Sequence, residues 1–422
     1  MARVVVFAEA REVLTLAEGP ASARGGRAQG ALGRLERASV VVRDGVIAWV
    51  GPHAALDLRA HAGASDEVEI HECKGRALMP GLVDSHTHLV WGGDRKDELE
   101  MRLAGADYEQ IFAAGGGILS SVRQTRARDE DALHAESLRR ALRMLRGGTT
   151  TFEIKSGYGL DLETELRQLR VARRLREQDG LRVVSTCLAA HALPAEHRAS
   201  PEGRERFLAE VCEAVLPAVA AEGLAEFADV FCDRGAFTPA ETRRVLEQAR
   251  ALGMKIRVHA NELGPTGGAK VAAELGAASA DHLLHVDDDD RRALREAGVV
   301  ATLLPGTSLV LRKPYADGRA LVDAGVAVAV ASDCNPGSCA IESLTLCLAL
   351  ACHGCRLSIA EAICGVTHNA AASLGRAHEV GRITPGLAGD VLLLATDDHR
   401  DLVYHAGSQL IAAVFQGGRR VA

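Results

Sequence analysis

The segment Leu78-Met79-Pro80-Gly81-Leu82-Val83-Asp84-Ser85-His86-Thr87-His88-Leu89 decides how this chain can fold. It rises through an apolar run to Leu82-Val83 and then places two histidines one residue apart. Side chains at i and i+2 of a β-strand point to the same face, so His86 and His88 are predicted to project together from a strand end. Two imidazoles in that position can share one metal ion. Pro80-Gly81 marks a turn just before the strand.

Downstream of this segment, short apolar strands alternate with longer helical patterns as far as Leu374. The predicted strands are Leu82–Asp84, Thr149–Ile154, Val183–Ala189, Ala225–Phe231, Lys255–His259, Ser279–His282, Val299–Leu303 and Val326–Ala331. Helical patterns lie between them, for example at 162–177, 202–221, 239–252, 288–297 and 338–352. This alternation predicts an α/β protein with a (β/α)8 TIM-like barrel. The alternative is a doubly wound open sheet, which would more naturally carry a glycine-rich nucleotide turn where this chain has His86-Thr87-His88.

Both ends of the chain read as strands. Ala38–Val50 is predicted to form a hairpin turned by Asp44-Gly45, and strand patterns return at 390–394 and 411–415. Before the hairpin, Gly19–Gly33 is rich in glycine, alanine and arginine, and we expect it to be a flexible loop. Two β-rich ends around one barrel predict a small discontinuous β-sandwich domain built from both termini. The predicted units are residues 1–77 and 375–422 for this domain and 78–374 for the barrel.

Composition excludes several classes of protein. A chain of 422 residues, 47% hydrophobic and 25% charged, can form a full-sized hydrophobic core and more than one domain. The net charge of −7 argues against a nucleic-acid partner. No segment has the roughly 18 consecutive apolar residues of a membrane span, and the N-terminus does not resemble a secretory signal. The ten cysteines read as buried reduced thiols, so we expect a cytoplasmic protein without a membrane partner.

The carboxyl ends of the predicted strands carry polar side chains that can act together, because all these ends meet at one mouth of a parallel barrel. The first strand offers His86 and His88, the fifth His259 and Glu262, the sixth His282, and the eighth Asp333. Each residue alone could be an ordinary solvated group at a strand end. Six such groups on four strand ends are hard to obtain by chance, and they predict an active site.

Three imidazoles and one carboxylate, from His86, His88, His259 and Asp333, suit zinc, and imidazole also suits iron. Such an ion lowers the pKa of a bound water from 15.7 to about 7 and polarises a carbonyl. Glu262 or His282 could then take and return protons.

Several of these motifs together resemble the amidohydrolase superfamily of metal-dependent hydrolases. They are the run from Pro80 to His88, His259, His282, Ser332-Asp333 and Thr367-His368-Asn369-Ala370-Ala371, and they span the barrel. The resemblance implies hydrolysis of amides, cyclic amides or amidines with one or two metals. Two-metal members usually carry a carboxylated lysine at the end of the fourth strand, and the fourth strand here, 226–233, has none. Lys155 lies on the second strand, so we expect one divalent or trivalent ion, zinc or iron.

Within that superfamily the chain is most similar to the imidazolonepropionase family of histidine degradation. The motifs are Trp91-Gly92-Gly93-Asp94-Arg95, Gly115-Gly116-Gly117-Ile118, Glu153 to Leu160, Ala190 to Pro194 and Ser332 to Ser338. The resemblance implies cleavage of the cyclic amide of 4-imidazolone-5-propanoate to N-formimidoyl-L-glutamate, and a homodimer. The alternative is another mononuclear amidohydrolase, such as a nucleobase deaminase, but aromatic residues make up only 3% of the chain. A non-catalytic relative would have lost metal ligands that this chain retains.

The resemblance also implies which residues bind the substrate and its carboxylate tail. They are Arg95, Tyr158, His191, Glu262, Asn335, Gly337 and Ser338. Arg95 is a planar bidentate carboxylate receptor, although Lys96-Asp97-Glu98 after it allows a surface ion pair instead.

Tyr158 and His191 could fix the ring and the tail, with a loop anchor and a packing histidine as their alternatives. Asn335, Gly337 and Ser338 are expected to offer hydrogen bonds near the start of the helix predicted at 338. The implied catalytic residues are Glu262 at the ring and water, His282 in proton transfer, and Asp333.

Overall fold

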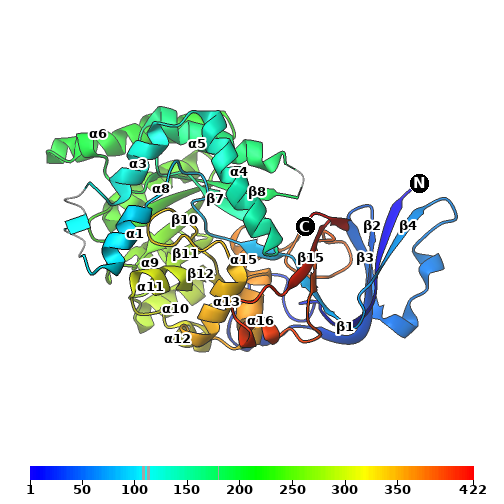
Figure 1. The fold of residues 1–422 in the computed structure, drawn as a ribbon. Helices are drawn as coiled ribbons and strands as arrows, with labels where there is room; N and C mark the ends of the chain where they lie inside the picture. The colour runs from blue at the N-terminus through cyan, green and yellow to red at the C-terminus, as the bar shows by residue number, and fades with distance from the viewer. Residues whose placement is uncertain (107–109, 112–114, 179) are drawn as a thin grey trace.

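Eight parallel strands form the centre of the computed structural model, which describes residues 1–106, 110–111, 115–178 and 180–422 (Figure 1). In spatial order they are β6 (Leu82–Asp84), β7 (Thr149–Lys155), β8 (Arg182–Ala190), β9 (Phe227–Cys232), β10 (Lys255–Ala260), β11 (Ser279–His282), β12 (Val300–Leu303) and β13 (Val328–Val330). Each overlaps a strand predicted from the apolar runs, and neighbours pair in parallel. The predicted (β/α)8 barrel is confirmed.

The barrel closes between its first and last strands, which have only three residues each. Beyond the ends of β6 and β13, the backbone N–H of Asp333 donates to the carbonyl of His86 at 3.0 Å, and the N–H of His88 donates to the carbonyl of Cys334 at 2.9 Å. The N–H of Ser332 also donates to the Asp84 carboxylate at 3.0 Å. The segments that close the barrel are therefore the ones that carry the histidine pair and the aspartate.

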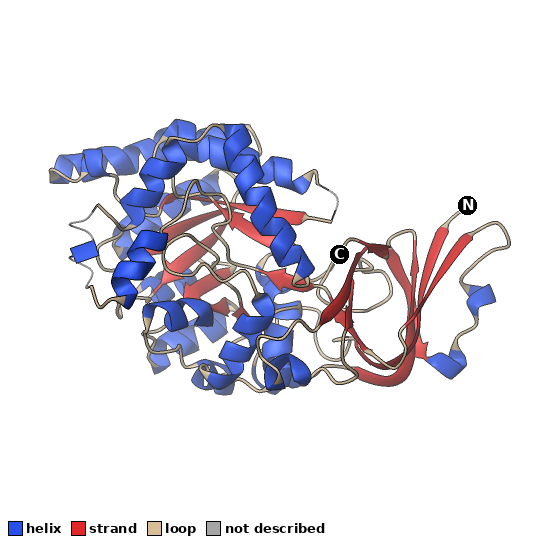
Figure 2. Cartoon of the chain, in the orientation of Figure 1, coloured by secondary structure: helices blue, strands red, loops and turns tan. Residues whose placement is uncertain are grey.

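Helices surround the barrel (Figure 2). In chain order they are α1 (Lys96–Leu103), α3 (Ile118–Arg126), α4 (Glu130–Arg146), α5 (Leu162–Arg176), α6 (Pro201–Glu210), α7 (Leu216–Ala221), α8 (Pro239–Ala251), α9 (Gly268–Glu274), α10 (Asp288–Ala297), α11 (Pro305–Leu311), α12 (Gly318–Asp323), α13 (Leu344–His353), α14 (Ile359–Gly365), α15 (His368–Ser373) and α16 (Asp401–Tyr404). Within the described residues, no helix combines the length and the apolar composition needed to cross a bilayer.

Two predicted helices differ from the structure. The helical pattern at 202–221 is divided by a π-helical turn at Val211–Val215. The helix predicted at 338–352 begins six residues later, at Leu344, because the Ser343 hydroxyl accepts the N–H of Leu346 at 3.2 Å and caps it there. The residues before Ser343 therefore form a loop and not the first turn of a helix.

Strands from both termini form one further sheet beside the barrel (Figure 2). Its order is β16 (Arg419–Arg420), β15 (Ile411–Gln416), β14 (Val391–Leu394), β5 (Ala77–Pro80), β1 (Arg3–Leu14), β2 (Arg34–Arg43) and β3 (Val46–Pro52), with β4 (Glu67–Glu72) paired to β1. The sheet curves round an apolar interior in which the rings of Phe7 on β1 and Phe415 on β15 lie 4.7 Å apart. Strands β14 and β5 separate these residues within the sheet, so its two halves face each other as the predicted β-domain requires. The boundaries predicted at 77 and 374 stay predictions.

The segment Gly19–Gly33 is packed against the barrel, and its prediction as a flexible loop is wrong. The side-chain amide of Gln29 donates to the carbonyl of Val328 at 2.9 Å and accepts the N–H of Val328 at 3.0 Å. The guanidinium of Arg24 is buried and donates to backbone carbonyls. Val328 begins β13, so this segment covers the end of the barrel opposite the strand carboxyl ends. Composition could not reveal partners that lie 299 residues away.

We expect Gln29→Ala to lower the free energy of unfolding by about 1–3 kcal/mol, because the buried N–H of Val328 loses its acceptor. The measurement is a urea titration followed by circular dichroism. The control is Gln409→Ala, an exposed amide that should change stability by less than about 0.5 kcal/mol. Equal midpoints for the two variants would contradict the packed role of the segment.

Candidate active site

The four side chains predicted to bind a metal meet at the carboxyl end of the barrel. Oδ1 of Asp333 lies 3.5 Å from Nε2 of His86 and 3.5 Å from Nε2 of His88. Nε2 of His259 lies 3.4 Å from Nε2 of His88. All four side chains are buried. Strands that are far apart in the sequence thus form two overlapping clusters of possible ligands. One is His86, His88 and Asp333, the other is His86, His259 and His282, and the ligand atoms of each lie within 4.8 Å of one another.

Carboxylates on other strands orient two of these rings. Nδ1 of His86 lies 2.7 Å from Oδ2 of Asp281, and Nδ1 of His259 lies 2.9 Å from Oδ2 of Asp229. A neutral imidazole that donates from Nδ1 keeps its lone pair on Nε2. Neutral His86 would therefore offer its Nε2 lone pair beside Asp333, while Nδ1 of His259 lies close to Asp229 but forms no hydrogen bond with it.

This arrangement fits a metal cation. Nε2 of His86 is buried without a hydrogen-bond partner among the described residues, which is costly for a polar atom. The Nε2 atoms of His88 and His259 face each other at 3.4 Å, and they carry facing lone pairs when both neutral rings are protonated at Nδ1. One borderline cation satisfies all three nitrogens and the carboxylate together.

The surroundings shift the pKa values of these donors in different directions. Burial lowers the pKa of His88 to about 4, so the ring is neutral near pH 7. Burial raises the pKa of Asp333, but the adjacent His86 and His88 rings more than offset this and hold it well below its usual range. Burial lowers the pKa of His86, while Asp281 and Asp333 raise it to about 9, so a bound metal would displace a proton there.

His282 and Glu262 lie beside this group. The His282 ring centroid is 5.3 Å from that of His259 and 5.6 Å from that of His86. Nε2 of His282 lies 3.8 Å from Oε2 of Glu262, and Nζ of Lys313 donates to Oε1 of Glu262 at 3.2 Å. Burial raises the pKa of Glu262, but His282 and Lys313 outweigh it and bring it below its usual value. Burial also lowers the pKa of His282.

The backbone is strained where two of these residues project from the barrel. His282 has φ +76° and Asp333 has φ +53°, in the left-handed region that residues other than glycine rarely adopt. Such strain persists only where the surrounding structure enforces it, and it concentrates at functional sites. Here it turns the two side chains inward at the strand ends.

Tyr158 and His191, which follow β7 and β8, lie next to the histidine pair. The His191 ring stacks on His88 with centroids 5.0 Å apart and planes 18° apart, and its Nδ1 lies 3.0 Å from the carbonyl of Gly157. The Tyr158 ring is 5.8 Å from His88 and 5.4 Å from His191. Burial raises the pKa of Tyr158, so the phenol keeps its proton and remains a hydrogen-bond donor.

Arg95 forms an ion pair with Glu98 at 2.6 Å, as the alternative prediction for this residue expected. The pair does not lie on the surface, because the two side chains are only 13% and 10% exposed. Its guanidinium lies against Gly337, where an added Cβ would come within 1.8 Å of Nη1. A larger residue at 337 would therefore displace the Arg95 guanidinium from its present position. Arg95 and Gly337 also line a cavity of about 410 Å³.

Asn335 organises the loop after β13. Its Oδ1 accepts the N–H groups of Gly337 at 2.9 Å and of Ser338 at 2.8 Å, and its Nδ2 donates to the carbonyl of Asp333 at 2.7 Å. The predicted helix start at Ser338 is wrong, so no helix terminus faces the site here. These two N–H groups are held by the asparagine side chain.

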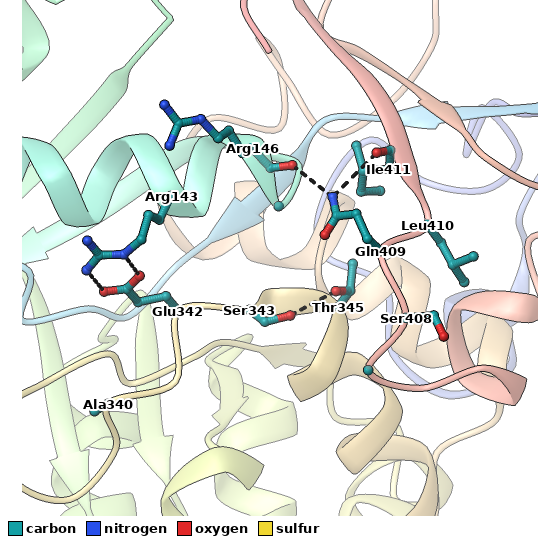
Figure 3. A pocket seen from close by; sticks show the side chains of 12 residues that line it. Arg143, Arg146, Ala340, Glu342, Ser343, Thr345, Ser408, Gln409, Leu410 and Ile411 are labelled. Carbon is teal, nitrogen blue, oxygen red and sulfur yellow. Dashed lines mark hydrogen bonds and ion pairs between the residues drawn. The ribbon is translucent and has the colours of Figure 1, made fainter.

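A second cavity, of about 590 Å³, lies between the barrel and the terminal segment 407–411, and none of its lining residues is a predicted site residue (Figure 3). Arg143 of α4 and Glu342 form two hydrogen bonds at one side of it (Figure 3). It separates the two parts of the fold and contributes no group to the site.

Several residues that contact the site were missed from the sequence. They are Glu153, Lys155, Asp229, Arg257, Asp281, Thr307 and Lys313. The sequence could have indicated the strand residues among them. Charged or polar residues alternate with apolar ones in Glu153-Ile154-Lys155 and in Arg257-Val258-His259. Alternation on a barrel strand places one set inside the barrel. Lys313 lies in a loop and carries no such signal.

Comparisons with known proteins show the family to which the chain belongs. The family model described as "Amidohydrolase family" matches residues 77–421. An imidazolonepropionase from Geobacillus kaustophilus (strain HTA426) is 44% identical over 419 residues, covering 99% of this chain and 98% of that protein. One from Porphyromonas gingivalis (strain ATCC BAA-308 / W83) is 44% identical over 409 residues, covering 97% and 95%.

Solved structures show the same fold at low identity. A guanine deaminase from E. coli has a TM-score of 0.71 at 15% identity, covering 100% of this chain and 99% of that one. An adenosine deaminase from Xanthomonas campestris has a TM-score of 0.70 at 20% identity, covering 99% and 92%. At these identities the likeness concerns the fold alone.

We expect the purified protein to hold one metal ion per chain, and its removal by a chelator to lower the melting temperature, because a ligand bound only by the folded state stabilises it. Elemental analysis and a thermal melt measure the two effects. A third cluster, Glu12, Asp398 and His399, serves as a control. The Glu12 carboxylate is already engaged by His399 and Arg34, so His399→Ala should leave the metal content unchanged. A metal-free wild type, or equal stability with and without chelator, would contradict this site.

Proposed function

The chain belongs to the amidohydrolase family and, within it, to the imidazolonepropionases, and we propose that its barrel mouth opens the ring of 4-imidazolone-5-propanoate. It is a hydrolase that acts on the C–N bond of a cyclic amide, in histidine degradation. The product of this hydrolysis is N-formimidoyl-L-glutamate. The observation that supports the proposal most is that His86, His88 and Asp333 form one close cluster and His259 lies 3.4 Å from His88 beside it. The chain is also 44% identical to such an enzyme over nearly its full length.

We propose that these four residues hold one divalent ion, zinc or iron. Glu153, Asp229, Asp281 and Asp333 carry four negative charges, and Lys155 and Arg257 carry two positive ones. A cation bound beside these carboxylates would compensate buried negative charge. When bound, the ion supplies Lewis-acid chemistry: it polarises the ring carbonyl and makes a water nucleophilic near neutral pH.

The substrate is held by its charged tail and its flat ring. Arg95 receives the propionate carboxylate, for which a planar guanidinium is the best-matched partner. Tyr158 and His191 border the ring on the side of His88, and Tyr158 donates from its protonated phenol. The loop of Asn335, Gly337 and Ser338 lies beside Arg95 and completes the binding surface.

Hydrolysis adds the water oxygen to the ring carbonyl carbon and breaks the bond from that carbon to the ring nitrogen, which must receive a proton. Glu262, kept ionised by His282 and Lys313, contacts ring and water and accepts a proton from the water. His282, whose pKa burial lowers, assists in returning it to the leaving nitrogen. Asp333 is assigned two roles in this proposal: its carboxylate binds the metal and also takes part in proton transfer.

A nucleobase deaminase remains the alternative. Deaminases share the fold, yet at 15% and 20% identity they support no activity for this chain. A panel of nucleobases tested beside the imidazolone separates the two, and we expect turnover of the imidazolone alone. Turnover of a nucleobase instead would overturn the substrate assignment.

We further propose that the enzyme works as a cytoplasmic homodimer without nucleic-acid partners. The net charge of −7 supports the last point, because a nucleic-acid surface would repel such a protein.

We expect Arg95→Ala to lower kcat/KM, mainly through a higher KM, because the buried carboxylate of the substrate then lacks its partner. The loss corresponds to about 2–5 kcal/mol of transition-state stabilisation. The assay follows loss of imidazolone absorbance and appearance of formimidoylglutamate. Arg102→Ala is the control, because Arg102 lines the same cavity as Arg95. Equal losses of kcat/KM in both variants would mean that positive charge in the cavity, and not the guanidinium of Arg95 in particular, binds the carboxylate tail.

We expect Lys313→Met to move the acidic limb of the pH profile of kcat/KM to higher pH. Lys313 lowers the pKa of Glu262, so its removal raises that pKa, and the carboxylate then becomes protonated at a higher pH. Lys313→Arg keeps the charge and should retain the wild-type limb. An unshifted limb in Lys313→Met would exclude Glu262 as the group that must be ionised.

A further inference from the structure

The side chain of Lys155 is completely buried inside the barrel, where an ammonium requires carboxylate partners. Its Nζ lies 2.8 Å from Oε1 of Glu153, 2.9 Å from Oδ2 of Asp229 and 3.8 Å from Oδ2 of Asp281. Lys155 ends β7, while Asp229 belongs to β9 and Asp281 to β11. One ammonium thus joins three strands across the barrel interior.

Two of these carboxylates hold the rings of candidate metal ligands. Asp229 contacts Nδ1 of His259 at 2.9 Å and accepts the backbone N–H of His259 at 3.1 Å. Asp281 contacts Nδ1 of His86 at 2.7 Å. Each carboxylate oxygen that faces a ring, Oδ2 in both cases, is also the oxygen nearest to Lys155.

The third carboxylate holds the backbone between the two histidines of the first strand. Oε2 of Glu153 accepts the N–H of Thr87 at 3.1 Å, and the Thr87 hydroxyl donates to the carbonyl of Glu153 at 2.7 Å. The N–H of Lys155 itself donates to the carbonyl of Thr87 at 2.9 Å. The segment His86-Thr87-His88 is therefore tied to Lys155 through both backbone and side chain.

We propose that Lys155 is a positioning residue of the metal centre, whose ammonium holds Glu153, Asp229 and Asp281 so that Nε2 of His86 and of His259 are aimed before the metal binds. The inference rests on the proposed metal site and not on which ring is opened. Lys155 acts as an ammonium through its carboxylate partners, and it is not itself a ligand.

Removing the ammonium has two opposing consequences. Loss of a nearby positive charge would by itself strengthen cation binding through Coulomb attraction. Loss of the ammonium leaves Glu153 and Asp229 without their cation, and Asp281 keeps only Arg257, at 3.3 Å. The carboxylates then repel one another and turn away. His86 and His259 then lose the carboxylate contacts that orient their rings, which typically weakens metal binding 10–100-fold, by about 1.4–2.7 kcal/mol at 1.36 kcal/mol per tenfold. The sign of the change in affinity therefore tests the proposal.

The experiment compares Lys155→Met with wild type and with Lys255→Met, which makes the same change at an exposed lysine at the start of β10. Cobalt(II) is added to each metal-free protein in competition with a chelator, and its visible absorption reports ligand geometry. We expect Lys155→Met to bind cobalt about 10–100-fold more weakly, with an altered spectrum. Lys255→Met should match wild type in both measurements.

Affinity equal to or tighter than wild type in Lys155→Met would overturn the inference. Failure of wild type to bind cobalt would instead overturn the proposed metal site, so the two failures are distinguishable. If Lys155→Met does not fold, Lys155→Gln is measured in the same way and should also bind more weakly.

A double-mutant cycle tests whether Lys155 acts through Asp229. Asp229→Asn removes the carboxylate that receives the ammonium, so adding Lys155→Met to it should cost less affinity than Lys155→Met costs alone. Fully additive losses would show that the two residues act independently and would overturn the proposed route.

Discussion

The hydrogen bond from the backbone N–H of Asp333 to the carbonyl of His86, at 3.0 Å, belongs at once to the barrel and to its site. A barrel of parallel strands closes only when its last strand pairs with its first. Here β6 and β13 have three residues each and do not pair with each other along their strands. The residues that follow these two strands form the hydrogen bonds that close the barrel. The fold is therefore completed by the same segments that bring the imidazoles and the carboxylate together.

That closure surrounds an interior with an unusual number of charges. Glu153, Lys155, Asp229, Arg257 and Asp281 are all buried, and each would be unfavourable alone. Paired, they form a layer beneath the candidate metal centre, and two of the carboxylates in it fix the rings above. The interior of this barrel is thus both a core and the support for its active site.

Membership of the amidohydrolase family explains the architecture, while the residues at the strand ends narrow the chemistry. Deaminases with TM-scores near 0.7 share the fold, so the fold alone does not choose a substrate. The choice depends on side chains outside the histidine cluster. The side chains proposed for this role are Arg95, which lies against Gly337, and Tyr158 and His191, which lie beside His88.

The sequence by itself determined the barrel, its eight strands and the residues at their carboxyl ends, because periodicity and strand-end position are local properties. It also indicated the family, through motifs such as His86-Thr87-His88 and Ser332-Asp333. Only the tertiary structure decided the partners of Lys155, the contact of Lys313 with Glu262, and the docking of Gln29 on Val328. Those contacts join residues 74, 51 and 299 positions apart. Nothing in the local pattern of either partner identifies the other, since their proximity arises only when the strands close into a barrel.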